Sequence, residues 1–311
     1  MTVETAAPAV TGQEHWTTKP TEDGDVRLFL WEKYVGSPEG KAGTIVFVHG
    51  SSMASTPTFD LQVPGRPSSS VMDHFARLGF DTWCVDMEGY GRSDKRRDIN
   101  CDIATGADDL KAATDYIART RKVSSVLLYG LSSGALRAAL FTQRHPERVK
   151  RLALDAFVWT GKGSPTLEQR RKRLPEYQRS NRRPIDRAFV HSIFTRDHPG
   201  TADERVVDAF ADAILALDTS VPTGTYVDMC INLPLVDPER IPVPTLIMRG
   251  QYDGIASFDD VLEFFRRLPN PDKHLAVMPG LAHSSFHQKN YRIALHILEA
   301  FFTQPEPVYR G

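Results

Sequence analysis

Short runs of apolar and β-branched residues recur along the chain, and most of them end in glycine. Such runs are expected of strands that are buried on both faces of a sheet. An earlier stretch, residues 25–36 (DVRLFLWEKYVG), instead alternates apolar and polar residues, which predicts a half-exposed antiparallel strand. The predicted buried strands are 44–50, 81–89, 124–130, 149–157, 244–250 and 273–280.

Helical sequence separates these strands, with apolar residues spaced as on one face of a helix. Strand and helix therefore alternate. This pattern predicts an α/β fold with a mostly parallel central sheet and helices on both of its faces. The predicted helices are 69–79, 106–120, the segment after Gly134, 258–268 and 291–302.

The alternation breaks once, from about Thr160 to Val243, where no buried-strand pattern is found. This segment contains arginine-rich helical sequence, an amphipathic helix at 204–218 and a proline-rich return at 233–245. An insertion of this size between two core strands predicts a helical cap. We expect the cap to lie over the carboxyl ends of the strands, where open α/β sheets bind their ligands.

The predicted organisation is therefore a core domain with one large insertion. The core comprises residues 25–159 and 244–311, and the cap comprises residues 160–243. Residues 1–24 are polar, with threonine, proline and glycine, and they predict a loose N-terminal arm that leads to an edge strand.

The composition is that of a globular protein, with 41% hydrophobic and 25% charged residues among 311. The 38 Lys and Arg nearly balance the 39 Asp and Glu, so no overall field favours nucleic acid or an anionic membrane. Cys84, Cys101 and Cys230 lie far apart without metal-ligand spacing, which suits a reducing compartment. The chain has no signal-like leader and no run of roughly 20 apolar residues, and we expect a cytoplasmic protein.

The segment Gly130-Leu131-Ser132-Ser133-Gly134 follows a predicted buried strand and matches G-x-S-x-G only with Ser132 at its centre. A nucleophile at a sharp strand-to-helix turn has a strained backbone, and side chains two residues before and after it would collide. Around Ser133 the same offsets fall on Leu131 and Ala135, and Leu131 fits poorly. The pattern predicts Ser132 as a nucleophile; the alternative interpretation is an ordinary glycine-rich turn.

Acyl transfer also needs two N–H donors for the oxyanion. The N–H of Ser133, at the start of the following helix, is one candidate. The loop His49-Gly50-Ser51-Ser52 follows a neighbouring predicted strand, and the N–H of Ser51 is the second candidate, with Ser52 as the alternative. His49 precedes the turn and is expected to hold this loop by hydrogen bonds.

Two further candidates each follow a predicted strand. Asp253 is placed to accept a hydrogen bond from a histidine and fix its tautomer, although a structural capping role is the alternative. Asp155, after an earlier strand, is the fallback carboxylate. His283 precedes the last helix and completes the chain order Ser, Asp, His. His287 competes with it but falls at the start of the next helix.

Five motifs, VHGSS, DMEGYGRSD (86–94), GLSSG, RGQYDG and GLAHS, occur in an order that resembles the α/β-hydrolase superfamily over roughly residues 25–305. The resemblance is to the serine-nucleophile branch with a helical cap, which is carboxylesterase-like. Asp86 belongs to a loop that is typically structural in this superfamily. Serine at position 132 departs from the aspartate of haloalkane dehalogenases and epoxide hydrolases.

The resemblance implies Ser132 as nucleophile, His283 as base and then acid, and Asp253 as the residue that orients it. It implies neither a metal nor an organic cofactor. The expected function is a serine hydrolase that cleaves a small carboxylic ester through an acyl-enzyme. The alternatives are a carbon–carbon bond hydrolase of aromatic meta-cleavage products, a lactonase, amidase or cofactor-free perhydrolase, and a non-catalytic ligand-binding protein.

Between Gly161 and Gly200 there are ten Lys and Arg against four Asp and Glu. They form either a solvated helix face or a site where one or two arginines hold a substrate carboxylate. The second interpretation suits a half-ester such as a monoalkyl phthalate. Arg137, after the nucleophile, is closer in sequence and is expected either to bind such a group or to pair with a neighbouring carboxylate. The expected partner is thus a small-molecule ester. Both a monomer and a homodimer are compatible with the sequence, because an exposed apolar edge of helix 204–218 would form a dimer contact.

Overall fold

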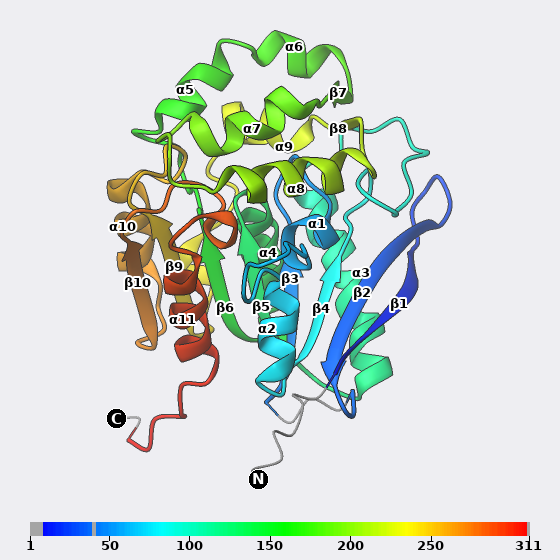
Figure 1. Ribbon diagram of the computed structural model, residues 1–311, viewed down its shortest axis with the longest axis vertical. Coiled ribbons are helices and arrows are strands. Elements are labelled where there is room, and N and C mark those ends of the chain that lie inside the picture. Colours follow the sequence, from blue (N-terminus) through cyan, green and yellow to red (C-terminus); the bar gives the residue numbers. More distant parts are fainter. Residues whose placement is uncertain (1–8, 39–41, 310–311) are drawn as a thin grey trace.

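A computed structural model of the chain describes residues 9–38 and 42–309. One sheet of eight strands, in the order β1-β2-β4-β3-β5-β6-β9-β10, runs through the molecule (Figure 1). The first two pairings, β1 with β2 and β2 with β4, are antiparallel, and all the others are parallel. The predicted α/β fold with a mostly parallel sheet is therefore confirmed. The strands are β1 (Val10–Lys19), β2 (Val26–Val35), β3 (Thr44–Val48), β4 (Asp81–Val85), β5 (Val126–Leu131), β6 (Val149–Asp155), β9 (Thr245–Gly250) and β10 (Lys273–Met278).

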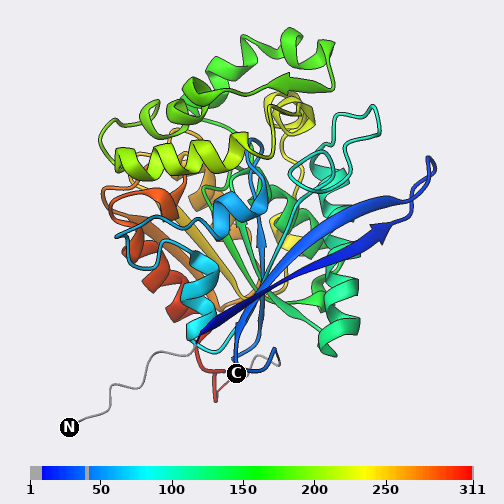
Figure 2. The same ribbon diagram turned by 45° about the vertical axis from the view of Figure 1, so that its right-hand side comes forward.

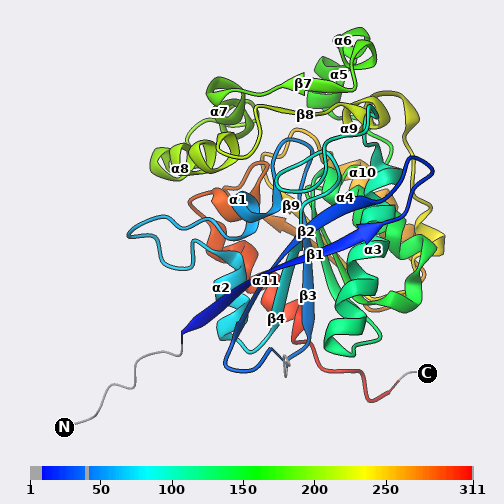
Figure 3. The same cartoon turned by 90° about the vertical axis from the view of Figure 1, so that its right-hand side faces the viewer.

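Helices cover both faces of the sheet. Seen along the sheet, α2 and α11 lie on one face, and α3, α4 and α10 lie on the other (Figure 3). Each of these helices has a predicted counterpart in the sequence. The bounds of the core helices are α1 (Ser55–Phe59), α2 (Val71–Arg77), α3 (Ile103–Arg121), α4 (Ser133–Arg144), α10 (Phe258–Arg267) and α11 (Tyr291–Phe302).

The central strands are apolar because both of their faces are covered. In β3 the side chains of Ile45, Val46, Phe47 and Val48 are all fully buried. The last strand, β10, was also predicted to be buried on both faces, and this is wrong. It pairs only with β9 and forms the edge of the sheet, so most of its side chains are at least partly exposed.

The prediction of a loose arm over residues 1–24 is also wrong for residues 10–19. Residues Val10–Lys19 form β1, which pairs with β2 over ten residues and makes the other edge of the sheet (Figure 2). Its inward side chains are polar and find charged partners elsewhere. His15 bonds Glu32 at 2.8 Å, and Lys19 pairs with Glu88 at 2.9 Å. The sequence of β1 therefore lacks the alternation of apolar and polar residues by which a half-buried strand is predicted. The part of the predicted arm before residue 9 lies outside the described residues.

The insertion between β6 and β9 folds as a layer of short helices over the carboxyl ends of the parallel strands (Figure 1). The amphipathic segment 204–218 gives α8, whose face of Val206, Val207, Phe210 and Ile214 is buried. The insertion also contains a two-stranded antiparallel sheet, β7 with β8, that no sequence pattern predicted. Its elements are α5 (Pro165–Arg171), α6 (Leu174–Arg179), β7 (Arg182–Pro184), α7 (Arg187–Thr195), α8 (Glu204–Leu215), β8 (Ser220–Pro222), α9 (Gly224–Val227) and one π-helical turn at Asp228–Asn232.

Three single turns of 3-10 helix complete the structure, at Pro146–Arg148, Pro238–Arg240 and Ser285–His287. Within the described parts of the chain, no helix combines the length and the apolar character that crossing a bilayer would need.

Candidate active site

Ser132 lies at the turn between β5 and α4, and its backbone is strained. Its φ of 60° and ψ of −122° are values that a non-glycine residue rarely adopts. A Cβ on Gly130 would lie 2.4 Å from the Gly134 carbonyl oxygen, and a Cβ on Gly134 would lie 2.3 Å from the Val48 carbonyl oxygen. Both positions therefore require glycine, which is the steric reason for the G-x-S-x-G pattern.

Three of the predicted residues come together at this turn. His283 Nε2 is 3.0 Å from Ser132 Oγ, and His283 Nδ1 is 3.2 Å from each carboxylate oxygen of Asp253. All three side chains are buried. With Nδ1–H donating to Asp253, the Nε2 lone pair is left to accept the Ser132 hydroxyl proton.

The charge of Asp253 is secured by its surroundings. Burial alone would raise its pKa, but the charge and hydrogen bond of His283 and the N–H groups of Ile255 and Ala256 lower this pKa to about 2. These two N–H groups donate to Oδ1 over 2.8 and 3.2 Å. Asp253 therefore remains a carboxylate and orients the imidazole.

Asp155, the fallback carboxylate, has other partners. It accepts hydrogen bonds from the hydroxyls of Tyr129, at 2.6 Å, and Ser285, at 3.0 Å. Burial and the nearby charge of Asp253 raise its pKa to about 6. Its carbonyl oxygen accepts the N–H of Ser132. Asp155 thus supports the nucleophile turn, and within the described residues it forms no hydrogen bond with a histidine.

His287, the competing base, is packed away from Ser132. Its ring lies 4.4 Å from that of Phe210 in the cap, and its Nδ1 bonds Ser284 Oγ at 3.0 Å. Burial and the charge of Arg66 lower the pKa of His287 to about 3. A neutral histidine between cap and core fits a packing role.

The two predicted oxyanion donors lie next to each other. Ser51 Oγ donates to Ser133 Oγ over 2.6 Å, so the loop after β3 is tied to the first residue of α4. A Cβ on Gly50 would be 3.5 Å from the Ser132 Cβ, which places this loop against the nucleophile. In the described part of the chain, the N–H groups of Ser51 and Ser133 have no hydrogen-bond acceptor. The alternative donor, Ser52, has a hydroxyl that accepts from a cap arginine, Arg183.

His49 and Arg137 support the same loop. The His49 ring donates from Nδ1 to the Gly50 carbonyl at 2.8 Å and accepts the Met87 N–H at Nε2. Burial and the charge of Arg137 lower the pKa of His49 to about 3, which keeps it neutral. Arg137 is fully buried and donates to the His49 carbonyl oxygen at 3.1 Å. It forms no ion pair with a described carboxylate, and its guanidinium carbon lies 5.3 Å from the centre of the Tyr90 ring.

The ten basic residues of the cap divide into three groups. Six of them are exposed, and Arg182 donates to the carbonyls of Gly89 and Ser220. Of the remaining three, Arg170 and Arg183 lie over the ring of Tyr226, and the charge of Arg196 acts on the same phenol; no sequence pattern singled out Tyr226. The exposed six are Lys162, Arg171, Lys172, Arg173, Arg179 and Arg187.

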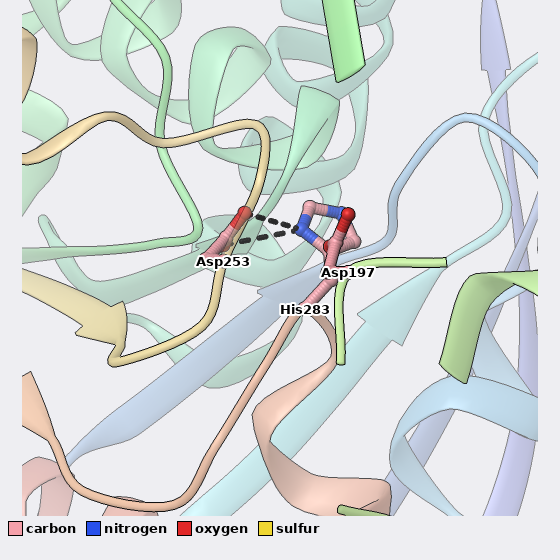
Figure 4. A group of neighbouring side chains, drawn as sticks. All are labelled: Asp197, Asp253 and His283. Carbon is pink, nitrogen blue, oxygen red and sulfur yellow. Dashed lines mark hydrogen bonds and ion pairs between the residues drawn. The ribbon is translucent and has the colours of Figure 1, made fainter. Parts of the chain in front are cut away.

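A second residue that sequence reasoning missed is Asp197, in the cap. Figure 4 shows it beside His283 and Asp253; one ligand atom from each of the three lies within 4.8 Å of the others. The Asp197 side chain is 3% exposed, and it accepts the Thr166 hydroxyl at 3.2 Å. A cation bound here would compete with the bonds of His283 to Ser132 or Asp253, so a metal at this place would block the arrangement described above.

A cavity of about 660 Å³ opens between cap and core, beside Arg196, Asp197, Tyr252 and Asp253. It leads from the surface to the carboxylate end of the Ser132–His283–Asp253 group. A nucleophile, a base, an oriented base partner and two free N–H groups are thus assembled under a cap.

Several proteins with related sequences or structures are described as hydrolases. The profile of the family described as serine aminopeptidase, S33, matches residues 41–290. The AB hydrolase superfamily protein YisY of Bacillus subtilis (strain 168) is 25% identical over 266 residues, which cover 82% of this chain and 90% of that protein.

Two solved esterases share the fold. The thermophilic esterase from Thermogutta terrifontis superposes with a TM-score of 0.64 at 19% identity, covering 92% of this chain and 97% of its own. The esterase of Exiguobacterium antarcticum gives a TM-score of 0.66 at 19% identity, covering 93% and 100% of the two chains.

The match to the family profile extends over most of the core and the whole cap, including the nucleophile turn and the residues around Asp253 and His283. The chain therefore belongs to the serine aminopeptidase S33 family of α/β hydrolases.

Proposed function

We propose that this α/β hydrolase cleaves a small carboxylic ester through an acyl-enzyme on Ser132. The observation that carries the proposal is the chain of contacts from Ser132 Oγ to His283 Nε2, at 3.0 Å, and from His283 Nδ1 to Asp253. A nucleophilic hydroxyl, an acceptor nitrogen and a fixed carboxylate in this order are the parts that acyl transfer requires.

In the first step His283 Nε2 takes the proton of Ser132 as Oγ attacks the ester carbon. The carbonyl oxygen becomes an oxyanion, and the N–H groups of Ser51 and Ser133 donate to it. The protonated His283, paired with Asp253, then gives the proton to the leaving alcohol. Collapse of the tetrahedral intermediate breaks the C–O bond and leaves an ester on Ser132 Oγ.

Water completes the cycle. His283 removes one proton from a water molecule as the water attacks the acyl-enzyme, and the same N–H groups stabilise the second oxyanion. Ser132 Oγ leaves with the proton that His283 carried. Each oxyanion donor is expected to contribute about 2.7–4 kcal/mol to the lowering of the barrier.

The substrate that we propose is a half-ester with a free carboxylate, such as a monoalkyl phthalate. Three guanidinium groups lie in the part of the cap that faces the oxyanion loop, and a negatively charged acid half would be attracted to them. The ammonium group of a free peptide N-terminus would be repelled by the same groups, so an ester is favoured over an aminopeptidase substrate.

The proposal is tested by initial rates on p-nitrophenyl acetate, p-nitrophenyl butyrate and a monoalkyl phthalate. We expect turnover that is abolished in Ser132→Ala, and covalent labelling of Ser132 by an active-site organophosphate, read by mass spectrometry. Absence of both ester turnover and labelling would overturn the proposal. Labelling without ester turnover would also overturn it in this form and would direct the next assay to carbon–carbon substrates.

A further inference from the structure

Two arginines of the cap lie against one phenol ring, and a third arginine lies nearby. The guanidinium carbons of Arg170 and Arg183 each lie 4.1 Å from the centre of the Tyr226 ring. Arg196 is close enough to stabilise a charge on the same phenol. The arginines come from α5, from β7 and from the end of α7, so the three elements converge on this point. Like charges brought together from separate elements repel one another, and this arrangement needs an anion to balance it.

The donors of these arginines are not all used. In the part of the chain that the structure describes, Arg170 Nη1, Arg183 Nε and Arg196 Nε are buried and have no hydrogen-bond acceptor. Neither Arg170 nor Arg183 forms an ion pair with a described carboxylate, and Arg196 pairs only with Asp197, at 3.5 Å. Buried guanidinium donors without acceptors are unfavourable, so the site is incomplete without a ligand that accepts from them.

The group also touches the catalytic machinery. Arg183 Nη2 donates to Ser52 Oγ at 2.5 Å and lies 3.4 Å from the Ser51 carbonyl oxygen. The Tyr226 hydroxyl is 3.4 Å from Ser52 Oγ. Ser51 supplies one of the oxyanion donors, and a ligand on the free Nε of Arg183 would therefore lie a short distance from the ester carbon.

We infer that Arg170, Arg183, Arg196 and Tyr226 form a binding site for the free carboxylate on the acid half of the substrate. This inference rests on the proposed function and identifies the residues that would select the half-ester. A carboxylate is favoured because a planar guanidinium fork matches its two oxygens. Because Arg183 directly contacts Ser52 of the oxyanion loop, we expect the half-ester of a short dicarboxylic acid, in which the free carboxylate and the ester carbonyl are close together.

The tyrosine gives this site a pH dependence. Burial would raise the pKa of the Tyr226 phenol, but the charges of Arg170, Arg183 and Arg196 lower it to about 7. Among the described residues, Tyr177 of α6 also contacts the ring, at 5.2 Å between ring centres, and Ser52 Oγ lies near the hydroxyl. Above pH 7 the phenolate neutralises the arginines, so carboxylate binding should weaken as the pH rises through this range.

The first experiment compares monoethyl phthalate with the uncharged p-nitrophenyl acetate. In Arg170→Gln and in Arg196→Gln we expect the ratio of kcat/KM for the two substrates to fall about 10- to 100-fold, because a charge-assisted hydrogen bond is lost. Arg187→Gln is the matched control, since Arg187 is exposed on the cap and pairs with Asp208. It should leave the ratio unchanged. An unchanged ratio in both site variants would overturn the inference.

The second experiment needs no turnover, so it separates this inference from the proposed function. Phthalate dianion is titrated into Ser132→Ala protein by calorimetry at pH 6 and pH 8, with inorganic phosphate and benzamide as comparison probes. We expect binding of phthalate that is weaker at pH 8, and Tyr226→Phe should abolish this difference because the competing phenolate is gone. No phthalate binding at either pH, or equal binding of benzamide, would overturn the anion site even if esters are hydrolysed.

Tighter binding of phosphate than of phthalate would overturn the assignment to a carboxylate. Arg183→Gln is left out of these comparisons because Arg183 also holds Ser52 in the oxyanion loop. Thermal unfolding of each variant shows whether it is folded, and the use of two independent arginine positions keeps the inference testable if one of them is not.

Discussion

Ser51 Oγ donates a hydrogen bond to Ser133 Oγ over 2.6 Å, and this bond joins the two segments that supply the oxyanion donors. The loop after β3 is also held to α4 by Arg137, which donates to the His49 carbonyl oxygen, but that bond is made two residues before Ser51. The distance between the two N–H groups, and hence their fit to one oxyanion, depends on this hydroxyl pair.

We expect Ser51→Ala and Ser133→Ala each to lower kcat on p-nitrophenyl acetate about fivefold, the effect of one hydrogen bond worth about 1 kcal/mol. Both N–H groups remain, so the loss should stay below the roughly 100-fold cost of removing a donor. The double variant should be no slower than either single variant, since both remove the same bond. If the loss of kcat in the double variant equals the product of the two single losses, this account is contradicted.

Asp155 ends β6 and Asp253 follows β9, and both strands lie on the same side of the nucleophile strand β5, but only Asp253 contacts His283. Asp253→Asn should lower kcat by up to about 10⁴-fold, because an amide does not fix the required tautomer. Asp155→Asn should cost less than about tenfold in kcat, because it alters only the support below Ser132. Steady-state kinetics of both variants on p-nitrophenyl acetate measure the two losses of kcat. A larger loss in Asp155→Asn than in Asp253→Asn would assign Asp155 as the residue that orients His283.

Of the two glycines in the nucleophile turn, Gly134 has less space for a side chain. A methyl group there would be 2.3 Å from the Val48 carbonyl oxygen and 2.5 Å from that of His49, both of them backbone atoms. We expect Gly134→Ala to lower the free energy of unfolding by about 3 kcal/mol or more, measured by urea denaturation. Gly65→Ala is the control. A Cβ at Gly65 would have open space around it, but the φ of +74° is left-handed. We therefore expect this variant to lose only the backbone cost of about 1–2 kcal/mol in its free energy of unfolding.

The buried histidine His287 makes the stability depend on pH. Its pKa is lowered from 6.5 to about 3, so below pH 6.5 the unfolded chain binds a proton that the folded protein does not. The stabilisation that it provides is therefore complete above pH 6.5 and is lost as the pH falls towards 3. Relative to wild type, His287→Gln should be less stable at pH 8, and the gap should narrow by about 1.4 kcal/mol per pH unit below 6.5.

Urea unfolding at pH 8, 6 and 5 measures this gap. The comparison with wild type cancels the contributions of His49, which has a similarly low pKa of about 3, and of the buried carboxyl groups. A gap that does not change with pH would show that folding leaves the pKa of His287 unshifted, and it would contradict this prediction.

Much of the core is predictable from the sequence because it depends on neighbours along the chain. The apolar runs of β3 and β5 are strands because both sheet faces are covered. The first glycine of G-x-S-x-G avoids a clash with Gly134, four residues along the chain, whereas the second avoids the backbone of Val48 in β3. The positions of Asp253 and His283 after their strands follow from the parallel sheet, which brings its carboxyl ends to one edge.

Other features depend on partners that are distant in the chain. The inward side chains of β1 include His15 and Lys19, so this strand has no apolar alternation that a sequence pattern could detect. Their burial becomes favourable only in the folded protein, where Glu32, Glu88 and Asp109 are their partners. The exposed β10 has the composition of a buried strand and differs only in lacking a second neighbour.

The sequence by itself determined the strand–helix order, the single inserted cap and Ser132 as the residue at the strained turn, since local sterics and periodicity control these. Only the tertiary structure decided which of the ten basic cap residues turn inward. Arg183 and the Ser52 that it contacts are 131 residues apart, and Tyr226 carries no local signal at all. The direction of a charged side chain on a cap is set by the surface that the cap closes over, and that surface exists only after folding.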